Sequence, residues 1–325
     1  MAVALVGPTA SGKSDIAWRV ARARRGVVEL VSVDSMAVYR GMDIGTAKPS
    51  AAERAEVPYH LVDLVDPDEE YTVALFQTAA RTALEGIAGR GGKALLVGGT
   101  GLYLRAVTDD LSFPGRFPLV TAGLTAELVA LGPEGTDDRL AGCAAMHTRL
   151  AGLDPVAAGR IEPGNERRLV RALEVTLGSG RPFSSFGPGL ERYPASRMHL
   201  MGVQREPEEL DRRIAERFDR LMDEGFLDEV RGLASKSCGL SRTARQALGY
   251  RELLSHVEDG VPLHEAVDEA VRRTRAFAKR QRSWFRRDPR IEWLDPAADP
   301  VALVADRLGH DIENPDGWDT KDPDR

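Results

Sequence analysis

The sequence predicts an α/β fold in which a parallel β-sheet is flanked by helices and interrupted by an all-helical insertion domain. Short apolar runs alternate with longer runs of helical periodicity, as in consecutive β-α-β units. The first apolar run, at residues 2–6, leads into a glycine-rich loop and then into a helical pattern. Between residues 115 and 182, helix-like runs follow one another without β-branched strands.

The loop after the first strand has the pattern of a phosphate-binding loop, or P-loop. It fits G-x-x-x-x-G-K-S, and its residues are Gly7, Pro8, Thr9, Ala10, Ser11, Gly12, Lys13 and Ser14. Glycines at both ends allow backbone angles and close approaches that a side chain would block. The loop N–H groups, the start of the next helix and Lys13 can hold a diphosphate, and the Ser14 hydroxyl can bind Mg²⁺. The sheet is therefore expected to be P-loop NTPase-like, although the motif does not specify the ligand.

The remaining elements follow from periodicity and from turn residues. Further strands are predicted at residues 27–33, 60–65, 93–97 and 198–203. Helices are predicted at residues 15–25, 73–90, 124–131, 140–153, 167–177, 208–224 and 271–290. Residues 41–49 contain two glycines and a proline and are expected to form a loop.

Domain boundaries are expected where proline and glycine cluster. Pro114, Gly115 and Pro118 precede the helical insertion, and Gly178, Gly180 and Pro182 follow it. The prediction is therefore a P-loop α/β core formed by residues 1–114 and 183–308, with a helical insertion domain at 115–182. Residues 309–325 are polar and are expected to be a disordered tail.

Two strand ends bear on the chemistry. In an open parallel sheet, ligands bind at the carboxyl ends of the strands, so Asp34, directly after the strand at 27–33, is expected beside the P-loop. The strand at 93–97 leads into Gly98-Gly99-Thr100-Gly101 rather than into the acidic residues usual in an ATP-hydrolysing enzyme. Asp34 is thus the main carboxylate expected near the phosphates, as a base, a magnesium-shell ligand or a structural residue.

Composition limits the class of protein. The chain has 325 residues, of which 42% are hydrophobic and 29% charged, and a mean hydropathy of −0.28. These values predict a soluble protein with a sizeable core, without a membrane span or a signal peptide. Cys143 and Cys238 are far apart and indicate neither a zinc site nor a disulfide framework, so a cytoplasmic location is expected. The net charge of −6 excludes a uniformly basic surface but not a local basic patch.

Residues 271–290 form such a patch, with eight arginines, one lysine and a single acid. The cations at 272, 275, 279, 282 and 286 recur at helical spacing, where like charges repel one another. A polyanion relieves that repulsion by counterion release, and the interspersed aromatic residues can stack on bases. The pattern favours contact with nucleic acid; the alternative is a basic face for solubility or for an acidic protein. The arginines in residues 208–224, Arg217 among them, alternate with acids, as on a solvated face.

Several motifs occur together and in order over about residues 3–290. They are GPTASGKS (7–14), SVDSMAVY (32–39), GMDIGTAKP (41–49), VGGTGLYL (97–104), DPVAAGRI (154–161), RLVRALEV (168–175), QALGYRE (246–252) and KRQRSWF (279–285). Together they resemble the tRNA dimethylallyltransferase family, also called IPP transferases. The resemblance implies transfer of the dimethylallyl group from dimethylallyl diphosphate to N6 of adenosine 37, beside the anticodon of tRNA.

The resemblance also implies roles for individual residues. The P-loop would hold the diphosphate of the prenyl donor, with Mg²⁺ on Ser14. Asp34 matches the presumed general base, and Thr100 and Arg217 match positions that touch the diphosphate, which with Lys13 completes the catalytic set. The implied partners are dimethylallyl diphosphate and a tRNA anticodon stem-loop, bound by a monomer.

Contacts with tRNA are implied for four segments and for Thr100. The residues concerned are Asp34, Ser35, Met36, Ala37, Thr100, Arg167, Arg168, Arg171, Gln246, Gly249, Tyr250, Arg251, Lys279, Arg280, Gln281, Arg282, Trp284 and Arg286. One departure is Val120-Thr121, where the family usually has Val-Arg. It implies that one phosphate or sugar contact is missing in the insertion.

Two alternatives stay open at this point. A prenyltransferase acting on free adenine nucleotides would share the N-terminal motifs but would have no evident use for the basic helix at 271–290. A P-loop kinase or an RNA-binding ATPase would bind ATP, which the absence of an acidic pair after residues 93–97 disfavours.

Overall fold

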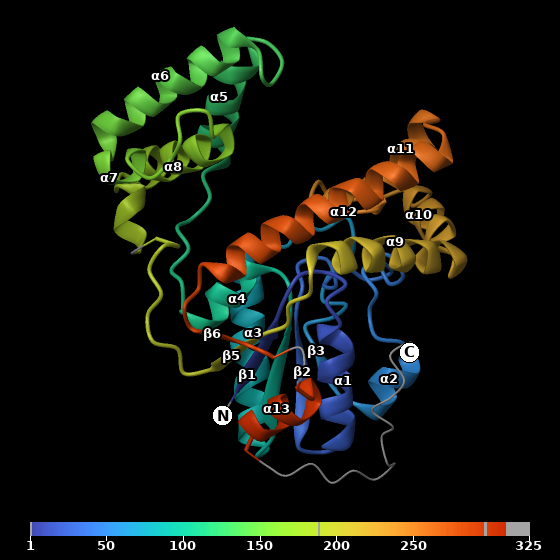
Figure 1. Cartoon of the computed structure of the whole chain (residues 1–325). Coiled ribbons are helices and arrows are strands. Elements are labelled where there is room, and N and C mark those ends of the chain that lie inside the picture. Colours follow the sequence, from blue (N-terminus) through green and yellow to red (C-terminus); the bar gives the residue numbers. More distant parts are fainter. Residues whose placement is uncertain (1, 188, 296–297, 310–325) are drawn as a thin grey trace. The chain divides into compact units, whose positions relative to one another are not determined.

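The computed structural model describes residues 2–187, 189–295 and 298–309 (Figure 1). The chain divides into two compact units, one containing residues up to Asp110 and from Pro194 onward, the other spanning Leu111–Tyr193. We call them the core unit and the insertion unit. The predicted tail lies, apart from Gly309, outside the described residues.

The insertion unit begins earlier and ends later than the predicted 115–182. Its later end has a clear cause in the short helix η1 (Phe183–Phe186). The carboxylate of Asp154 accepts hydrogen bonds from the backbone N–H and the hydroxyl of Ser184, both at 2.7 Å. These two hydrogen bonds attach η1, which follows Pro182, to Asp154 in the preceding helical part of the insertion unit.

The described part of the core unit contains one parallel six-stranded sheet in the order β3-β2-β4-β1-β5-β6. The strands are β1 (Val3–Val6), β2 (Val28–Val33), β3 (Tyr59–His60), β4 (Lys93–Gly98), β5 (His199–Gly202) and β6 (Ile291–Trp293). The strands predicted at 2–6, 27–33, 93–97 and 198–203 are confirmed with small differences at their ends. The α/β fold with a parallel sheet flanked by helices is likewise confirmed.

Helices cover both faces of this sheet, so its central strands are mostly buried and largely apolar. Helices α1 (Lys13–Ala23) and α13 (Pro300–Arg307) pack on the face that carries Val3 and Leu5. Helices α3 (Val73–Gly89) and α4 (Gly101–Thr108) pack on the face that carries Ala4 and Val6. Alternation along β1 thus separates two hydrophobic cores.

Four longer helices lie beyond the carboxyl edge of the sheet (Figure 1). They are α9 (Pro207–Asp223), α10 (Phe226–Ala234), α11 (Tyr250–Asp259) and α12 (Leu263–Arg286), with the short η2 (Ala244–Gln246) before α11. Phe226, Tyr250 and Phe285 are buried among these helices. They belong to the same hydrophobic core as the buried side chains of α3 and α4. These helices therefore cover the carboxyl ends of the strands.

The strand predicted at 60–65 is wrong beyond His60. Leu61 and Asp63 have φ angles of 64° and 58°, which end the extended conformation. Asp63 is held in that position by Lys48 and Arg54, at 2.6 and 2.5 Å. Only Val65 returns to a parallel bridge, with Tyr39.

Helix α12 differs from the predicted 271–290 at both ends. It begins at Leu263, since residues 263–270, which are acidic and apolar, are helical as well and precede the basic part. It ends at Arg286, shortly before Pro289. Arg290 instead forms ion pairs with Asp109 and Asp288, at 2.7 and 2.6 Å. The short elements α2 (Ala51–Glu56), β6 and α13 were not predicted either.

The insertion unit is a helical cluster with its own core. Its helices are α5 (Pro118–Val129), α6 (Asp137–Leu153), α7 (Pro155–Ala158) and α8 (Glu166–Ser179). The buried side chains include Leu128, Leu150, Leu169 and Leu173. Thr121, at the position where the family usually has arginine, donates its hydroxyl hydrogen to the carbonyl of Phe117 at 3.4 Å.

A substitution at Gly98 tests the close packing at the strand ends. A Cβ there would lie 2.0 Å from the carbonyl oxygen of Val33 on the neighbouring strand. We expect Gly98→Ala to lower the free energy of unfolding by about 3 kcal/mol, because strand backbone cannot move aside as a side chain can. Chemical denaturation followed by circular dichroism measures this change.

Gly232→Ala is the matched control, since Gly232 is exposed on α10 and a Cβ there meets no atom within 4 Å. This control is expected to stabilise the protein by about 0.5–1 kcal/mol through helix propensity. Equal stability of the two variants would contradict the packing argument.

Candidate active site

The parallel register brings four strand ends together. Val6 of β1 pairs with Gly98 of β4, which also pairs with Val33 of β2, and on its other side Val6 pairs with Gly202 of β5. The residues that follow these strands, among them Gly7 and Asp34, therefore start at the same level of the sheet. This confirms that the P-loop and Asp34 share one edge.

The P-loop makes a tight turn between β1 and α1. Ala10 and Gly12 have φ angles of 60° and 92°, and Gly12 directly precedes α1. A Cβ at Gly7 would lie 2.5 Å from the carbonyl oxygen of Val203, so this position requires glycine. Ser11 is fully buried, and its hydroxyl oxygen has no hydrogen-bond partner within the described residues. This conformation suits an anion at the start of α1.

Three cationic side chains hold the carbonyl oxygens of the P-loop. Lys13 Nζ donates to the carbonyl of Pro8, Arg213 Nε to that of Ala10, and Arg205 Nε to that of Ser11, each at 3.0 Å. Binding the carbonyl groups in this way leaves the loop with a positive environment. Sequence reasoning missed Arg205 and Arg213, because among alternating charges nothing distinguishes them from solvated arginines.

The charged side chains near the P-loop shift one another's pKa values. Burial and the neighbouring Arg217 lower the pKa of Lys13 to about 8, while Asp34 acts in the opposite direction. Burial also lowers the pKa of Arg217, again opposed by Asp34. Within the described residues Arg217 forms no hydrogen bond or ion pair. Two cations that lose hydration near one carboxylate are arranged to receive an anion.

Asp34 and Thr100 lie at the ends of neighbouring strands and are both half-buried. Asp34 Oδ1 accepts hydrogen bonds from the backbone N–H groups of Met36 and Ala37, at 2.8 and 3.4 Å. Thr100 Oγ1 accepts from the N–H of Ser35 at 3.3 Å. The second carboxylate oxygen of Asp34 and the hydroxyl hydrogen of Thr100 remain available to a ligand.

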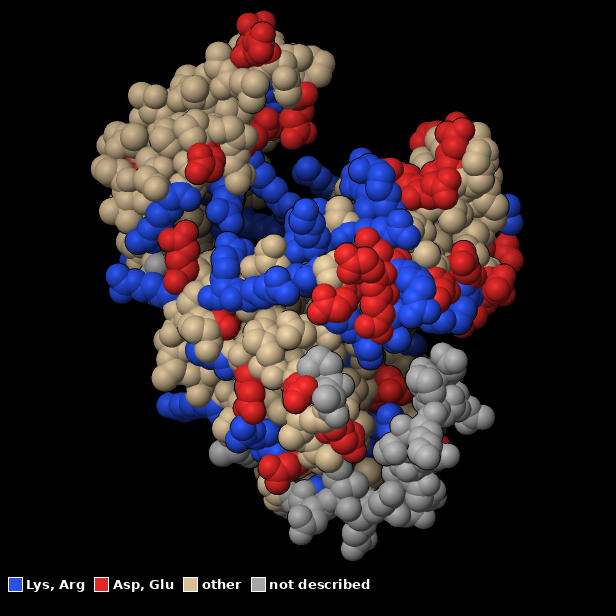
Figure 2. Space-filling model, in the orientation of Figure 1, with Lys and Arg blue, Asp and Glu red and all other residues tan. Residues whose placement is uncertain are grey.

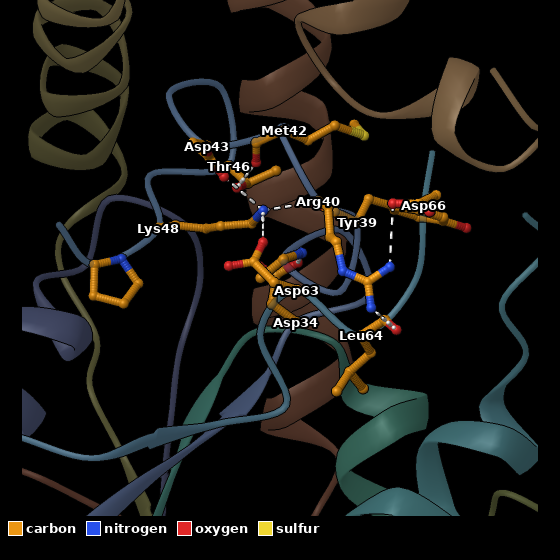
Figure 3. Close-up of polar contacts among 12 residues, drawn as sticks. Asp34, Tyr39, Arg40, Met42, Asp43, Thr46, Lys48, Asp63, Leu64 and Asp66 are labelled. Carbon is orange, nitrogen blue, oxygen red and sulfur yellow. Dashed lines mark hydrogen bonds and ion pairs between the residues drawn. The ribbon is translucent and has the colours of Figure 1, made fainter. Parts of the chain in front are cut away.

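A buried lysine fixes the loop that follows Asp34 (Figure 3). The Lys48 side chain is 1% exposed, and its Nζ donates to the carbonyl of Tyr39 at 2.5 Å. It also forms ion pairs with Asp43 at 2.8 Å and Asp63 at 2.6 Å. This one ammonium group therefore connects the Asp34 loop with residues 41–49, which form a loop as predicted.

Glu229 holds the same loop from α10. Its carboxylate accepts hydrogen bonds from the backbone N–H groups of residues 43, 44 and 45, at 2.8, 2.8 and 3.2 Å, and from the Tyr250 hydroxyl at 2.5 Å. Burial and the charge of Glu229 raise the pKa of Tyr250. A Cβ at Gly45 would lie 2.3 Å from the Phe226 ring, so α10 packs directly on the loop.

Several residues predicted to contact tRNA have side chains that face the protein interior. Tyr250 is 1% exposed, Gly249 lies under the Phe226 ring and Ala37 is 6% exposed, so none of them offers a side chain to a partner. Arg171 is half-buried and donates to the carbonyls of residues 114 and 115 at 2.9 and 3.2 Å. Motif matching selected these residues together with their exposed neighbours, although their side chains serve internal packing.

Two predicted contacts on α12 also face the protein. Gln281 is 7% exposed, and its amide is bonded to the backbone of Thr9 and Gly99, both at 2.9 Å. Trp284 is half-buried, and a Cβ at Gly101 would lie 2.1 Å from its indole nitrogen. Gln281 and Trp284 therefore pack against the loops at the strand ends, and their contacts with tRNA stay predictions.

The accessible side of α12 is basic. Figure 2 shows lysine and arginine side chains gathered over the middle and end of this helix. Lys279, Arg280 and Arg286 are exposed and Arg282 is half-buried; none of the four has an ion-pair partner among the described residues. The remaining predicted contacts that stay exposed are Arg167, Arg168, Gln246 and Arg251.

The described residues contain no cluster of three or more His, Cys, Asp or Glu side chains suited to a metal ion. Mg²⁺ does not require such a cluster, because it is commonly held by one or two protein groups together with substrate phosphates. The exposed Ser14 hydroxyl at the start of α1 fits that type of site. Separately, none of the helices described is long and apolar enough to cross a membrane.

A pH titration tests the charge of Lys13. With a pKa of about 8, the Lys13 amine is mostly charged at pH 7, and it loses its positive charge as the pH rises through 8. We expect the affinity for inorganic diphosphate, measured by isothermal titration calorimetry, to fall by up to about tenfold per pH unit above pH 8. Lys13→Met should bind about tenfold or more weakly at pH 7. Titration of diphosphate itself affects both proteins, so parallel pH profiles would contradict the prediction.

Comparisons with known proteins identify the family to which this chain is similar. Residues 37–288 match the family described as IPP transferase. A tRNA dimethylallyltransferase of Desulforudis audaxviator is 46% identical over 309 residues, covering 94% of this chain and 96% of the relative. One of Acidothermus cellulolyticus is 48% identical over 321 residues, covering 98% and 94%.

Solved structures show the same likeness. The full-length tRNA isopentenylpyrophosphate transferase of Bacillus halodurans aligns with a TM-score of 0.64 at 36% identity, covering 94% of this chain and 96% of that one. A eukaryotic dimethylallyltransferase acting on tRNA aligns with a TM-score of 0.70 at 27% identity, covering 90% and 73%. With the P-loop, Asp34 and Thr100 at one sheet edge, these matches show that the chain belongs to the IPP transferase family.

Proposed function

We propose that this protein is a tRNA dimethylallyltransferase that transfers the dimethylallyl group of dimethylallyl diphosphate to N6 of adenosine 37. The observation that carries the proposal is the combination of two surfaces on one unit. A P-loop surrounded by Lys13, Arg205, Arg213 and Arg217 can bind a diphosphate. The end of α12 presents basic residues that form no ion pair among the described residues to a polyanion. The named relatives act in this reaction class.

The acceptor side of the reaction centres on Asp34. The N6 lone pair of adenine is delocalised into the ring, so the amine is a weak nucleophile that benefits from a base. As N6 bonds to C1 of the prenyl group, the C1–O bond breaks and its electron pair leaves with the diphosphate. The N6 proton passes to the free carboxylate oxygen of Asp34, whose other oxygen is fixed by Met36 N–H.

The donor side stabilises the leaving group. Negative charge builds on the diphosphate as the C1–O bond breaks, so donors directed at it favour the transition state. Lys13, Arg217 and the Thr100 hydroxyl supply such donors. Burial removes water from both cations and lowers their pKa values in the free protein. A bound diphosphate would stabilise their charged forms and so compensate for that lost hydration.

We further propose that Mg²⁺ accompanies the diphosphate. The Ser14 hydroxyl would hold it, and the bound ion would neutralise charge on the phosphate oxygens. The monomeric state and the cytoplasmic location stay predictions.

On the RNA side, the exposed residues of α12 would contact phosphates of the anticodon stem-loop. The target base lies within a stacked loop and must be turned outward to reach Asp34. Arg167 and Arg168 of the insertion unit and Gln246 and Arg251 of the core unit are further candidate contacts, since all are exposed. Nucleic-acid contact of this kind relies on charge and stacking rather than on a single motif.

The direct test is to incubate the protein with dimethylallyl diphosphate, Mg²⁺ and an anticodon stem-loop containing A37, and to analyse the nucleosides by mass spectrometry. The expected product is N6-(dimethylallyl)adenosine. Replacing A37 by guanosine removes the acceptor amine and is the control. Preference for free AMP, ADP or ATP over the stem-loop would indicate a nucleotide prenyltransferase instead. Consumption of ATP without use of the prenyl donor would indicate a kinase or ATPase.

Asp34→Asn tests the base. Asparagine keeps an oxygen for the Met36 and Ala37 N–H groups but cannot take a proton. We expect kcat to fall by about 10²–10⁴-fold, with the Kd for the stem-loop within about threefold of the parent. Asp219→Asn, at an exposed position of α9, should leave both unchanged. Unimpaired turnover in Asp34→Asn would remove Asp34 as the base.

Arg282→Gln and Arg286→Gln test the basic helix. Each should weaken stem-loop binding and reduce the slope of log affinity against log salt by about one, because one phosphate contact is lost. Arg231→Gln removes an arginine of α10 that is paired with Asp228, and is expected to leave the slope unchanged. Identical slopes in all the proteins would mean that Arg282 and Arg286 do not touch phosphate.

A further inference from the structure

Gln281 occupies an unusual position on the basic helix. Lys279, Arg280 and Arg282, which surround it in the sequence, are exposed or half-exposed, whereas Gln281 is 7% exposed. An uncharged amide thus stands on the inner side of a helix turn whose outer side is cationic. Burial of an amide is favourable only when its hydrogen bonds are satisfied.

Both ends of the Gln281 amide are bonded to backbone at the strand ends. Oε1 accepts the N–H of Thr9 in the P-loop at 2.9 Å, and Nε2 donates to the carbonyl of Gly99 after β4 at 2.9 Å. The two bonds have opposite polarity, which an amide satisfies and a carboxylate or an apolar side chain does not. One side chain therefore spans the loops that follow two adjacent strands.

The backbone around Gln281 leaves little room for movement. A Cβ at Gly99 would lie 2.3 Å from Gln281 Nε2 and 3.1 Å from the carbonyl oxygen of Gly7. Gly99 is thus a glycine because the amide and the P-loop both approach it closely. The next residue, Thr100, accepts the N–H of Ser35 beside Asp34.

We propose that Gln281 is a positioning residue for the reaction, which sets the spacing between the P-loop and the Gly99–Thr100 turn. It turns the N–H of Thr9 away from the ligand and holds the carbonyl of Gly99, so that the diphosphate donors and the Thr100 hydroxyl keep one arrangement. It acts through these two backbone groups and not by touching tRNA. The inference rests on the proposed function, since the spacing matters for transfer from a bound diphosphate.

Two substitutions separate this role from general stability. Gln281→Met keeps the length and loses both hydrogen bonds; Gln281→Glu keeps the shape but directs an acceptor at the Gly99 carbonyl. At pH 8 we expect both to lower kcat/KM for dimethylallyl diphosphate about tenfold or more, with stem-loop Kd within about twofold of the parent. Asp219→Asn, at an exposed position of α9 outside both surfaces, is the control and should change neither value.

The pH profile supplies a readout that loss of packing alone does not produce. A buried glutamate at 281 has a raised pKa, and in its protonated form it can donate to Gly99 while accepting from Thr9. The ratio of Gln281→Glu activity to parent activity should therefore rise as the pH falls from 8 to 6. The ratio for Gln281→Met should stay flat.

Several outcomes would overturn the inference. Folded variants with parent kcat/KM at all pH values would show that the two bonds do not position the site. A loss of stem-loop affinity with unchanged donor kinetics would make Gln281 an RNA contact instead. If the parent protein forms no prenylated product, the proposed function fails, and the affinity of Gln281→Met for inorganic diphosphate still tests the spacing: about tenfold weaker binding supports it, and unchanged binding overturns it.

Discussion

The parallel alignment of β1, β2 and β4 is the constraint on which the site depends. Val6, Gly98 and Val33 lie at one level across these strands, so the chain leaves the sheet three times at the same edge. The P-loop, Thr100 and Asp34 therefore begin at one edge of the sheet, and Gln281 of α12 joins two of the loops there. The close approach of Val33 to Gly98 shows how little space this arrangement leaves between the strands.

Charge is concentrated at that edge in a way that is costly without a ligand. Arg205, Arg213 and Lys13 hold P-loop carbonyls, and Arg217 stands near Asp34 without a hydrogen bond among the described residues. Removing cations from water lowers their pKa values, as seen for Lys13 and Arg217. Arg205 already pairs with Glu209 at 2.7 Å, and a diphosphate would supply further negative charge beside Lys13 and Arg217.

Helix α12 joins two tasks by using different sides. Its outer side presents cations that form no ion pair among the described residues, while its inner side places Gln281 and Trp284 against the loops after β1 and β4. Under the proposed function, the outer side would contact the substrate RNA while the inner side contacts the P-loop, which requires both kinds of residue within one turn. This explains why the KRQRSWF segment mixes basic, amide and aromatic residues.

The sequence alone determined the strands β1, β2, β4 and β5, the P-loop and the position of Asp34, because these depend on local patterns and on the rule that parallel strands end together. It also indicated the basic helix, through charge density at helical spacing. It did not predict β6 or the left-handed residues Leu61 and Asp63, since short strands and single backbone angles depend on distant partners such as Lys48.

Tertiary structure alone decided which side of each motif faces a ligand. Tyr250 and Gln281 belong to segments that resemble tRNA contacts, yet hydrogen bonds to Glu229 and to the strand-end loops turn them inward. Arg205 and Arg213 appear as solvated arginines in the sequence, but in the fold they donate hydrogen bonds to carbonyl groups of the P-loop. The physical reason is that burial and hydrogen-bond partners arise from residues up to 272 positions apart in the chain, which periodicity and motif spacing do not record.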